Sequence, residues 1–591
     1  MPYLLPGAIA FVVVIGYPLV TNVYFSLFKW RGGMAPLRWN GLGNYADLMG
    51  DDKFWTSFGN SLAMIVAMVL VPTLLGLVLA AVLFDYLGRR FGAQVSSVLR
   101  ATYYLPQILP VAVAGVLWNW ILNSQTGALN QILRGMGIAA PPNWLGDPTT
   151  ALPSVMLVLI WVQMGYPVVI FMAALQRVDP ELYEAAELDG AGWWDRFRAI
   201  TVPQIRPETF VVTLTCTVAA LKVFGPIYVL TRGGPESSTL VPSYYSYLSF
   251  FDKSQVGYGS AIATVLTLVI VVVAVIILGL QNRAERRERR GSDMAVATDV
   301  RPPARPAQVR TTAVDSRYRR GAGRWLVLAA AVLVGLAVLA PFGIMLLNAF
   351  KSPQDYAANG PLSWPSSLYL DGVVAFWERT EFPVKLWNSV FIAGIVAVLG
   401  ALLSLLNAYA IGIGRVKGRL WIVALFLLAN MLPQEALIYP LFTMAQSVGL
   451  SNSQWSVIII FTVIQSAFGT YLLSSVLGTF PPALLEAAAL DGASRWRILW
   501  QVVFPIVRPT LSVLMIFFFI WTWNEFFIPL VMLTSNDTQT IPIALASLQG
   551  DRMMDAPTIN AGSLVSLVPA VVFFLIFQRT LTRGVTAGAV K

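Results

Sequence analysis

Long apolar stretches alternate with short polar segments along almost the whole chain. Each stretch has the roughly 20 apolar residues that an α-helix needs to cross a bilayer. The pattern predicts six such stretches before a polar segment at 283–324 and six after it. We therefore expect an all-α integral membrane protein, with two tandem six-helix transmembrane domains and 12 transmembrane helices. The predicted spans are 4–28, 60–84, 101–122, 151–175, 208–231, 257–281, 325–350, 387–412, 420–445, 454–476, 510–534 and 561–581.

The polar segment 283–324 divides the chain into domains at 1–282 and 325–591. It is basic and Pro-rich and has almost no large apolar residues, so it cannot form a core. We expect a flexible cytoplasmic linker, whose first residues (RAERRERR) can continue the preceding helix. Residues 1–28 lack a basic start and a small-residue cleavage site, so we interpret them as the first span and not as a signal peptide.

The distribution of basic residues predicts the orientation. If both termini are cytoplasmic, 28 of the 40 Lys and Arg residues fall on the cytoplasmic side, as the positive-inside rule requires. The net charge of +10 then reflects membrane topology and not a nucleic-acid partner. The chain has one cysteine and no histidine, which excludes His-containing zinc sites and Ser-His-Asp triads within it. We expect no metal site and no catalytic constellation.

Self-comparison reveals a duplicated loop. Residues 180–207 and 482–509 share 13 identities at a constant offset of 302, including Glu-Ala-Ala and Leu-Asp-Gly-Ala. A shorter repeat pairs Leu105-Pro106-Gln107 with Leu432-Pro433-Gln434. The change of offset places 25 extra residues of the first half most naturally in the outer loop 123–150. Both long copies fall between the fourth and fifth spans of their half, on the predicted cytoplasmic side. An amphipathic helix lying on the headgroups is the alternative for a single copy.

The pattern E-A-A-x3-G-x9-I-x-x-P in this loop resembles the EAA loop of binding-protein-dependent ABC importer permeases. The first copy matches it at Glu184, Ala185, Ala186, Gly190, Ile200 and Pro203, and the second replaces the Ile with Val502. The segments 223–235 and 523–530 resemble those of the two permeases of carbohydrate (maltose/trehalose-like) importers. Those permeases are usually separate chains, whereas here two are fused.

The resemblance implies a function for the chain. Each EAA loop forms a coupling helix that docks on an ATP-binding subunit, and an extracytoplasmic solute-binding protein delivers the sugar. ATP and Mg²⁺ then belong to the two partner ATPases, and this chain binds no cofactor and is not an enzyme. In agreement, it has no Gly-Lys pair with which to build a phosphate-binding loop. The implied location is the cell membrane of a prokaryote. The expected ATPase-coupling residues are Glu184, Ala185, Ala186, Asp189, Gly190, Glu486, Ala487, Ala488, Asp491 and Gly492.

A secondary transporter of the major-facilitator type is the alternative. That family has an Asp and Arg-rich motif after the second span, and Asp85, Gly88, Arg89 and Arg90 resemble part of it. The second half has no copy of the motif. The EAA duplication therefore favours the ABC importer.

Polar residues within spans indicate the substrate pathway. Placing an ionisable side chain inside a bilayer is energetically unfavourable. The presence of Lys222, Glu435 and Glu525 within predicted spans therefore indicates a structural or functional role. Lys222 and Glu525 occupy equivalent repeat positions, which predicts either a structural ion pair or a pathway lining that binds sugar hydroxyls. Sugars bind through aromatic faces and polar side chains. The candidate pathway residues are Trp118, Asn119, Gln163, Lys222, Tyr228, Gln434, Glu435, Trp521, Trp523, Asn524 and Glu525.

Overall fold

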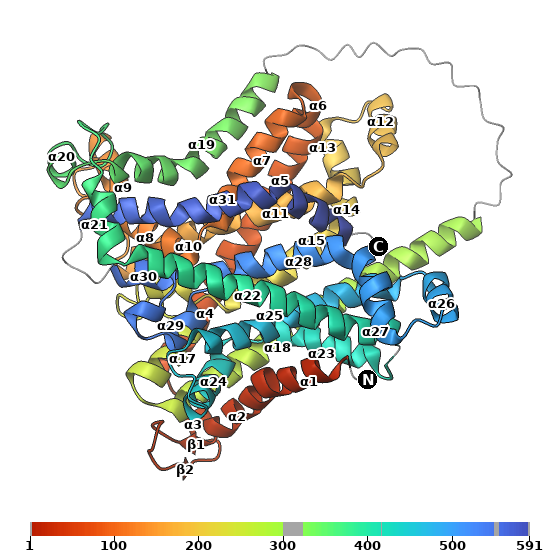
Figure 1. Ribbon diagram of the computed structural model, residues 1–591. Coiled ribbons are helices and arrows are strands. Elements are labelled where there is room, and N and C mark those ends of the chain that lie inside the picture. Colours follow the sequence, from red (N-terminus) through yellow and green to blue (C-terminus); the bar gives the residue numbers. More distant parts are fainter. Residues whose placement is uncertain (1–2, 299–322, 415, 549–554, 589–591) are drawn as a thin grey trace.

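A computed structural model describes residues 3–298, 323–414, 416–548 and 555–588. Long helices run side by side from one end of the molecule to the other (Figure 1). Among these residues, nine helices are long and apolar enough to cross a membrane, or eleven if each of two bent helix pairs counts as one span. The nine are Leu5–Ser26, Asp52–Leu87, Pro148–Leu175, Val256–Ala284, Trp325–Ala349, Phe382–Ile413, Gln454–Gly478, Arg495–Asn524 and Ala556–Phe573.

The first half contains 18 helices and one small hairpin, several of them segments of a single span. Short π-helical turns join some consecutive segments, for example at Val12–Gly16 and Val66–Leu70. Strands β1 (Phe28–Lys29) and β2 (Arg38–Trp39) pair antiparallel. The helices are α1 (Leu5–Phe11), α2 (Tyr17–Ser26), α3 (Gly43–Met49), α4 (Asp52–Ile65), α5 (Val71–Ala81), α6 (Gly88–Phe91), α7 (Ala93–Ile108), α8 (Val111–Ile121), α9 (Ala128–Gly135), α10 (Pro148–Gln163), α11 (Gly165–Leu175), α12 (Pro180–Leu188), α13 (Trp193–Arg196), α14 (Val202–Gln204), α15 (Arg206–Leu221), α16 (Gly225–Leu230), α17 (Pro242–Tyr247) and α18 (Val256–Thr298).

The second half repeats this plan with fewer helices among the described residues. Its π-helical turns are Tyr409–Ile413 and Ile498–Val503, and a 3-10 turn covers Asn536–Thr538. Its helices are α19 (Gly323–Ala349), α20 (Pro353–Asn359), α21 (Asp371–Arg379), α22 (Phe382–Ala408), α23 (Arg419–Met431), α24 (Glu435–Ser447), α25 (Gln454–Gly478), α26 (Pro482–Leu490), α27 (Arg495–Arg497), α28 (Phe504–Asn524), α29 (Phe527–Met532), α30 (Ile541–Leu548) and α31 (Ala556–Gly588).

The third span of each half is broken, and not straight as predicted. The axes of α7 and α8 differ by 95°, and those of α23 and α24 by 91°. Pro110 and Pro433 lie at the two breaks. Proline has no N–H to donate and disfavours helical geometry in the residue before it, so both sites interrupt the helical hydrogen bonds. The predicted spans 101–122 and 420–445 therefore each consist of two helices nearly at right angles.

The fifth span of each half is also interrupted. The predicted span 208–231 consists of α15 and the six-residue α16, with Lys222 at the end of α15. The predicted span 510–534 consists of α28 and the six-residue α29, with Glu525 at the end of α28. Both breaks occur at equivalent positions of the repeat.

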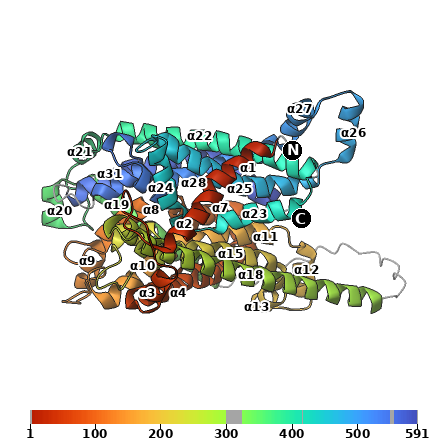
Figure 2. The same cartoon turned by 90° about the horizontal axis from the view of Figure 1, so that it is seen from below.

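The segment predicted as a linker begins as a helix. Helix α18 continues through the RAERRERR sequence to Thr298, so residues 283–298 are helical and not flexible. Figure 2 shows the end of α18 beyond the body of the molecule, at the end that also carries α12 and α26. The remaining expectation, a flexible segment, falls on residues 299–322, which lie outside the described residues.

The first helix of each half packs against the other half. Near the N-terminus, Phe11 of α1 meets Phe426 of α23 edge to face at 5.0 Å. In the opposite direction, Tyr103 of α7 donates to the carbonyl of Ala331 in α19 at 2.7 Å, and Trp161 of α10 donates to that of Val338 at 2.9 Å. The two halves are therefore interleaved through α1 and α19.

Candidate functional site

The two copies of the duplicated loop have the same backbone geometry. Helices α12 and α26 both end at a glycine with positive φ, +80° at Gly190 and +72° at Gly492. The next N–H donates back to the helix, from Ala191 to the Ala186 carbonyl at 2.9 Å and from Ala493 to the Ala488 carbonyl at 3.0 Å. This closure satisfies the free carbonyls at a helix end and favours glycine, because other residues are strained at positive φ.

The two loop helices also present the same exposed side chains. We use the term docking face for Leu182, Glu184, Ala185, Leu188 and Asp189 of α12, together with Leu484, Glu486, Ala487, Leu490 and Asp491 of α26. All ten residues are exposed, and the five pairs are identical. Leu188 is 79% exposed and Leu490 88%. Both helices lie at the end of the molecule that carries the two chain termini (Figure 1).

The side of each loop that faces the helix bundle differs between the halves. In the first half, the buried Arg196 pairs with Asp85 at 3.4 Å and with Glu187 at 2.9 Å. The equivalent residue in the second half is Ile498, which is buried in a cluster with Leu499 and Val503. Asp85, the residue that resembled the secondary-transporter motif, therefore has a local partner in the first loop.

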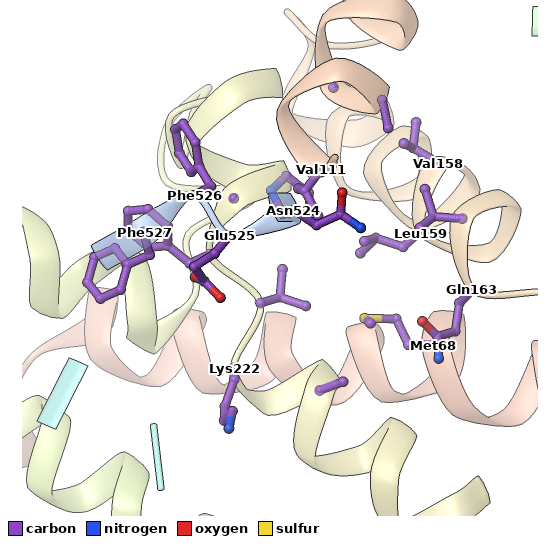
Figure 3. A pocket seen from close by; sticks show the side chains of 18 of the residues that line it. Met68, Val111, Val158, Leu159, Gln163, Lys222, Asn524, Glu525, Phe526 and Phe527 are labelled. Atoms are coloured by element: carbon purple, nitrogen blue, oxygen red, sulfur yellow. The ribbon is translucent and has the colours of Figure 1, made fainter. Parts of the chain in front are cut away.

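A cavity of about 330 Å³ lies where the four interrupted helices meet (Figure 3). The first residues of α8, α16, α24 and α29 all line it, as does the end of α10. Both halves contribute to it. The lining residues are Met68, Gln107, Val111, Ala114, Gly115, Val158, Leu159, Val162, Gln163, Ala219, Lys222, Val223, Phe224, Gly225, Pro226, Gln434, Glu435, Asn524, Glu525, Phe526 and Phe527.

The two carboxylates of the cavity lie where helices begin. Glu435 is the first residue of α24 and is 2% exposed. Glu525 precedes α29 and lies near the Gln434 side chain and the N–H groups of Phe526 and Phe527. Helix N-termini carry unpaired N–H groups and a partial positive charge, which stabilise carboxylates at both positions.

Lys222 lines the cavity but makes no ion pair within the described residues. Its ammonium donates to the backbone carbonyls of Asn430 and Leu432, at 3.1 Å each, where the second half is interrupted. The direct Lys222–Glu525 pair is therefore absent, although both residues border the same space (Figure 3). Both carbonyls lie close in sequence to Glu435, which lines the same cavity. An interrupted helix leaves carbonyls free, and these explain the position of the ammonium.

Three buried oxygen atoms of the cavity residues have no hydrogen-bond partner within the described part of the chain. They are Gln107 Oε1, Glu435 Oε2 and Asn524 Oδ1. Gln163 instead donates to the sulfur of Cys216 at 3.1 Å. A buried polar atom without a partner is costly, so these oxygens are ready to accept hydrogen bonds from water or from a solute.

The structure divides the predicted pathway residues into three groups. Gln163, Lys222, Gln434, Glu435, Asn524 and Glu525 line the cavity. Trp521 and Trp523 border an adjoining pocket of about 60 Å³, which shares Gln107 and Asn524 with the cavity. Trp118, Asn119 and Tyr228 line neither space.

Aromatic packing accounts for two of the residues outside the cavity. The ring of Trp118 meets that of Trp161 at 5.5 Å, and Tyr228 belongs to an aromatic cluster with Phe224 and Phe526. Sequence reasoning missed Gln107, although its repeat partner Gln434 was selected. The Leu-Pro-Gln repeat was the signal that pointed to it.

Comparisons with known proteins match both halves. The model of the family "Binding-protein-dependent transport system inner membrane component" matches residues 73–290 and 408–586. The probable ABC transporter permease protein YurN of Bacillus subtilis is 38% identical over 271 residues, which is 46% of this chain and 91% of that protein.

Two further relatives show the same pattern of coverage. The lactose transport system permease protein LacF of Rhizobium radiobacter is 32% identical and covers 43% of this chain and 84% of its own length. The trehalose/maltose transport system permease protein MalF of Thermococcus litoralis is 32% identical and covers 46% of this chain and 90% of its own length. Each relative thus has the length of about half this chain. The structure of a bacterial ABC transporter involved in alginate import aligns over 48% of this chain and 93% of its own, with 24% identity and a TM-score of 0.41.

Proposed function

The chain belongs to the family of binding-protein-dependent transport system inner membrane components, and from this premise we propose that it carries a sugar or oligosaccharide into the cell. It corresponds to two permeases in one multi-pass membrane chain. The observation that carries the proposal is the central cavity, which both halves line with polar side chains and whose buried oxygens lack partners. Sugar hydroxyls supply the hydrogen-bond donors that such oxygens need. Relatives named for lactose and for trehalose/maltose transport support the same class of solute.

We assign the docking face to the ATPase subunits, one at each loop. The exposed residues are identical in α12 and α26, so two ATPase subunits can dock through the same contacts. ATP and Mg²⁺ bind to those subunits, and this chain only transmits their movement. The end with α12, α26 and both termini is cytoplasmic in this proposal, and a solute-binding protein delivers the sugar at the opposite end. The membrane is the cytoplasmic membrane of a prokaryote.

Closure of the ATPase dimer would draw the two coupling loops together. The halves then reorient around the cavity, which opens alternately to the two sides. The interrupted helices leave polar backbone groups at the cavity, so the site can bind and release a hydroxyl-rich solute within the membrane. Family membership and the local role of Asp85 in the first loop leave nothing in support of a secondary transporter.

Reconstitution tests the proposed substrate class. The full chain, the ATPase and the solute-binding protein from the same source are placed in proteoliposomes, and uptake of radiolabelled disaccharides and amino acids is measured with and without ATP. We expect uptake of at least one saccharide that requires ATP and the binding protein. Uptake of amino acids alone, or uptake driven by an ion gradient without ATP, would contradict the proposal.

The backbone geometry that the two loops share offers a test of ATPase docking. Gly190→Ala and Gly492→Ala each add a Cβ at positive φ, which strains the backbone by roughly 1–2 kcal/mol. No atom lies within 4 Å of the added Cβ in either case, so strain and not a clash is the cause of any effect. We expect reduced co-purification of the ATPase and reduced uptake, with normal amounts of chain in the membrane. Gly279→Ala, a helical position with equally open space, is the matched control.

A further inference from the structure

The N-terminal segment of the first half reaches the coupling loop of the second half. The ring of Tyr3 stacks on that of Trp496 in α27, at 6.1 Å between centroids and 11° between planes. The same ring meets Tyr409, at the end of the second span of the second half, edge to face at 5.2 Å. Tyr409 in turn donates its hydroxyl to the carbonyl of Arg495 at 3.0 Å. Tyr3 thus lies between the helix bundle and the loop.

The position of Tyr3 is fixed by close packing of the helix that follows it. A Cβ at Gly7 would lie 2.0 Å from the side-chain oxygen of Asn407, so α1 and α22 approach each other as closely as only glycine allows. Asn407 is itself buried and donates to Thr470 at 3.1 Å. The N-terminal segment therefore cannot move away from α22 without losing this packing.

The aromatic packing around the first coupling loop is different. Trp194, the repeat equivalent of Trp496, has ring contacts with Trp193 and Phe197 of its own loop. The start of α19 contacts α6 instead, through Trp325 and Phe91 at 5.2 Å. An ion pair, Arg196 with Asp85, connects the first loop to the bundle at the position where the second loop has Ile498.

We propose that Tyr3 is a positioning residue that holds the second coupling loop from across the boundary between the halves. Stacking on Trp496 and the edge contact with Tyr409 keep α27, and through it α26, in one orientation. The orientation of the second loop then depends on the seating of α1, which belongs to the first half. This inference rests on the proposed function, in which α26 receives an ATPase subunit.

A pair of spin labels at matched sites tests the proposal. Leu490→Cys on α26 and Leu188→Cys on α12 are equivalent, highly exposed positions, and the only natural cysteine, Cys216, is buried. Label mobility is measured in the full chain in nanodiscs without ATPase. Aromatic contacts of this kind shift a conformational equilibrium by roughly two- to tenfold. We expect Tyr3→Ala to raise the mobile fraction at 490 by such a factor and to leave that at 188 unchanged.

Three variants distinguish the contact of Tyr3 with Trp496 and Tyr409, which we call the brace, from a general loosening of the N-terminal region. Tyr3→Phe keeps the ring and is expected to behave as wild type. Tyr409→Phe loses only the hydroxyl bond to Arg495, and we expect a smaller rise at 490. Tyr17→Ala removes an exposed tyrosine from the same N-terminal region and is the control. Three results would each overturn the proposal: unchanged mobility at 490 in Tyr3→Ala, an equal rise at both labels in that variant, or a rise at 490 in Tyr3→Phe as large as in Tyr3→Ala.

Adding the ATPase distinguishes this inference from the proposed function. With wild-type Tyr3, ATPase binding should immobilise the labels at both 490 and 188. If Tyr3→Ala loosens the label at 490 but the ATPase immobilises neither label, the brace is supported and the assigned docking face is wrong. If the ATPase immobilises both labels and Tyr3→Ala has no effect, the docking face stands and the brace is overturned.

Discussion

Asp51 connects α4, α17 and α18 in the first half. Its carboxylate accepts hydrogen bonds from the hydroxyls of Tyr245 and Tyr258 and from the N–H of Lys53. Burial alone would raise the pKa of the Asp51 carboxyl, but these bonds outweigh burial and hold the pKa below its ordinary value. The ionised carboxylate therefore stabilises the folded chain.

The sign of this shift gives a pH prediction. A carboxyl with a lowered folded pKa stabilises the protein above its unfolded pKa, about 3.9, and this stabilisation is lost as the pH falls through the folded pKa. We expect Asp51→Asn to lower the thermal unfolding midpoint at pH 7, and the difference from wild type to shrink below about pH 4. Asp47→Asn, at an exposed position nearby, is the control. A difference that is constant with pH would contradict this account.

Arg196 connects the first coupling loop to the helix bundle. It is buried and bonds both Asp85 and Glu187, so Arg196→Gln removes both of these ion pairs. Breaking a buried pair from one side typically costs about 3–5 kcal/mol. We expect Arg196→Gln to abolish ATPase co-purification at the first loop, and Asp85→Asn in the same chain to restore part of it. Simple additivity of the two changes in a double-mutant cycle would show that the pair carries no coupling.

At the scale of elements, the sequence predicts most spans but not their shape. Hydropathy identified the apolar stretches, because the membrane demands length and apolar composition. It does not distinguish a straight helix from two helices at 95°, since the apolar stretch continues through the break at Pro110. Proline is tolerated within membrane helices, so Pro110 and Pro433 alone did not identify the breaks.

The same limit applies to the cavity. Gln434, Glu435, Asn524 and Glu525 were identified because polar residues within apolar stretches need a reason to be there. The position of Lys222 was predicted, but its partners were not. They are backbone carbonyls at the interruption between α23 and α24, and a pattern of side chains cannot reveal such groups.

The interrupted helices revise the expected pairing of charges. Because the Lys222 ammonium bonds to the carbonyls of Asn430 and Leu432, in the same interruption as Glu435, we expect Lys222→Met to couple more strongly to Glu435→Gln than to Glu525→Gln. Each single variant should impair uptake. Two double-mutant cycles on uptake in proteoliposomes measure the couplings. Equal or reversed couplings would show that the repeat symmetry, and not the contact geometry, governs the charges.

At the scale of the whole molecule, the interleaving of α1 and α19 bears on the role of the linker. Residues 1–300 and 301–591 should restore uptake when co-expressed as two chains, since the relatives have the length of one half. Each half alone should be degraded, because α1 and α19 then lose their partners. Uptake and the membrane level of each fragment are the measurements. Failure of uptake with both fragments present and associated would assign the linker a further role.

The interleaving of α1 and α19 also leads to a prediction of how the protein melts. A transporter whose halves met at a flat boundary would absorb heat in two steps, one for each half. Here α1 is covered by α22 and α23, and Tyr103 and Trp161 bond to the backbone of α19. Neither half can lose its structure without exposing a helix of the other, so we expect a single peak in scanning calorimetry of the intact chain, with a calorimetric enthalpy equal to the van't Hoff enthalpy. Covalent fusion joins two permease domains in one chain. We expect the interleaved helices α1 and α19 to make these two domains unfold as one cooperative unit.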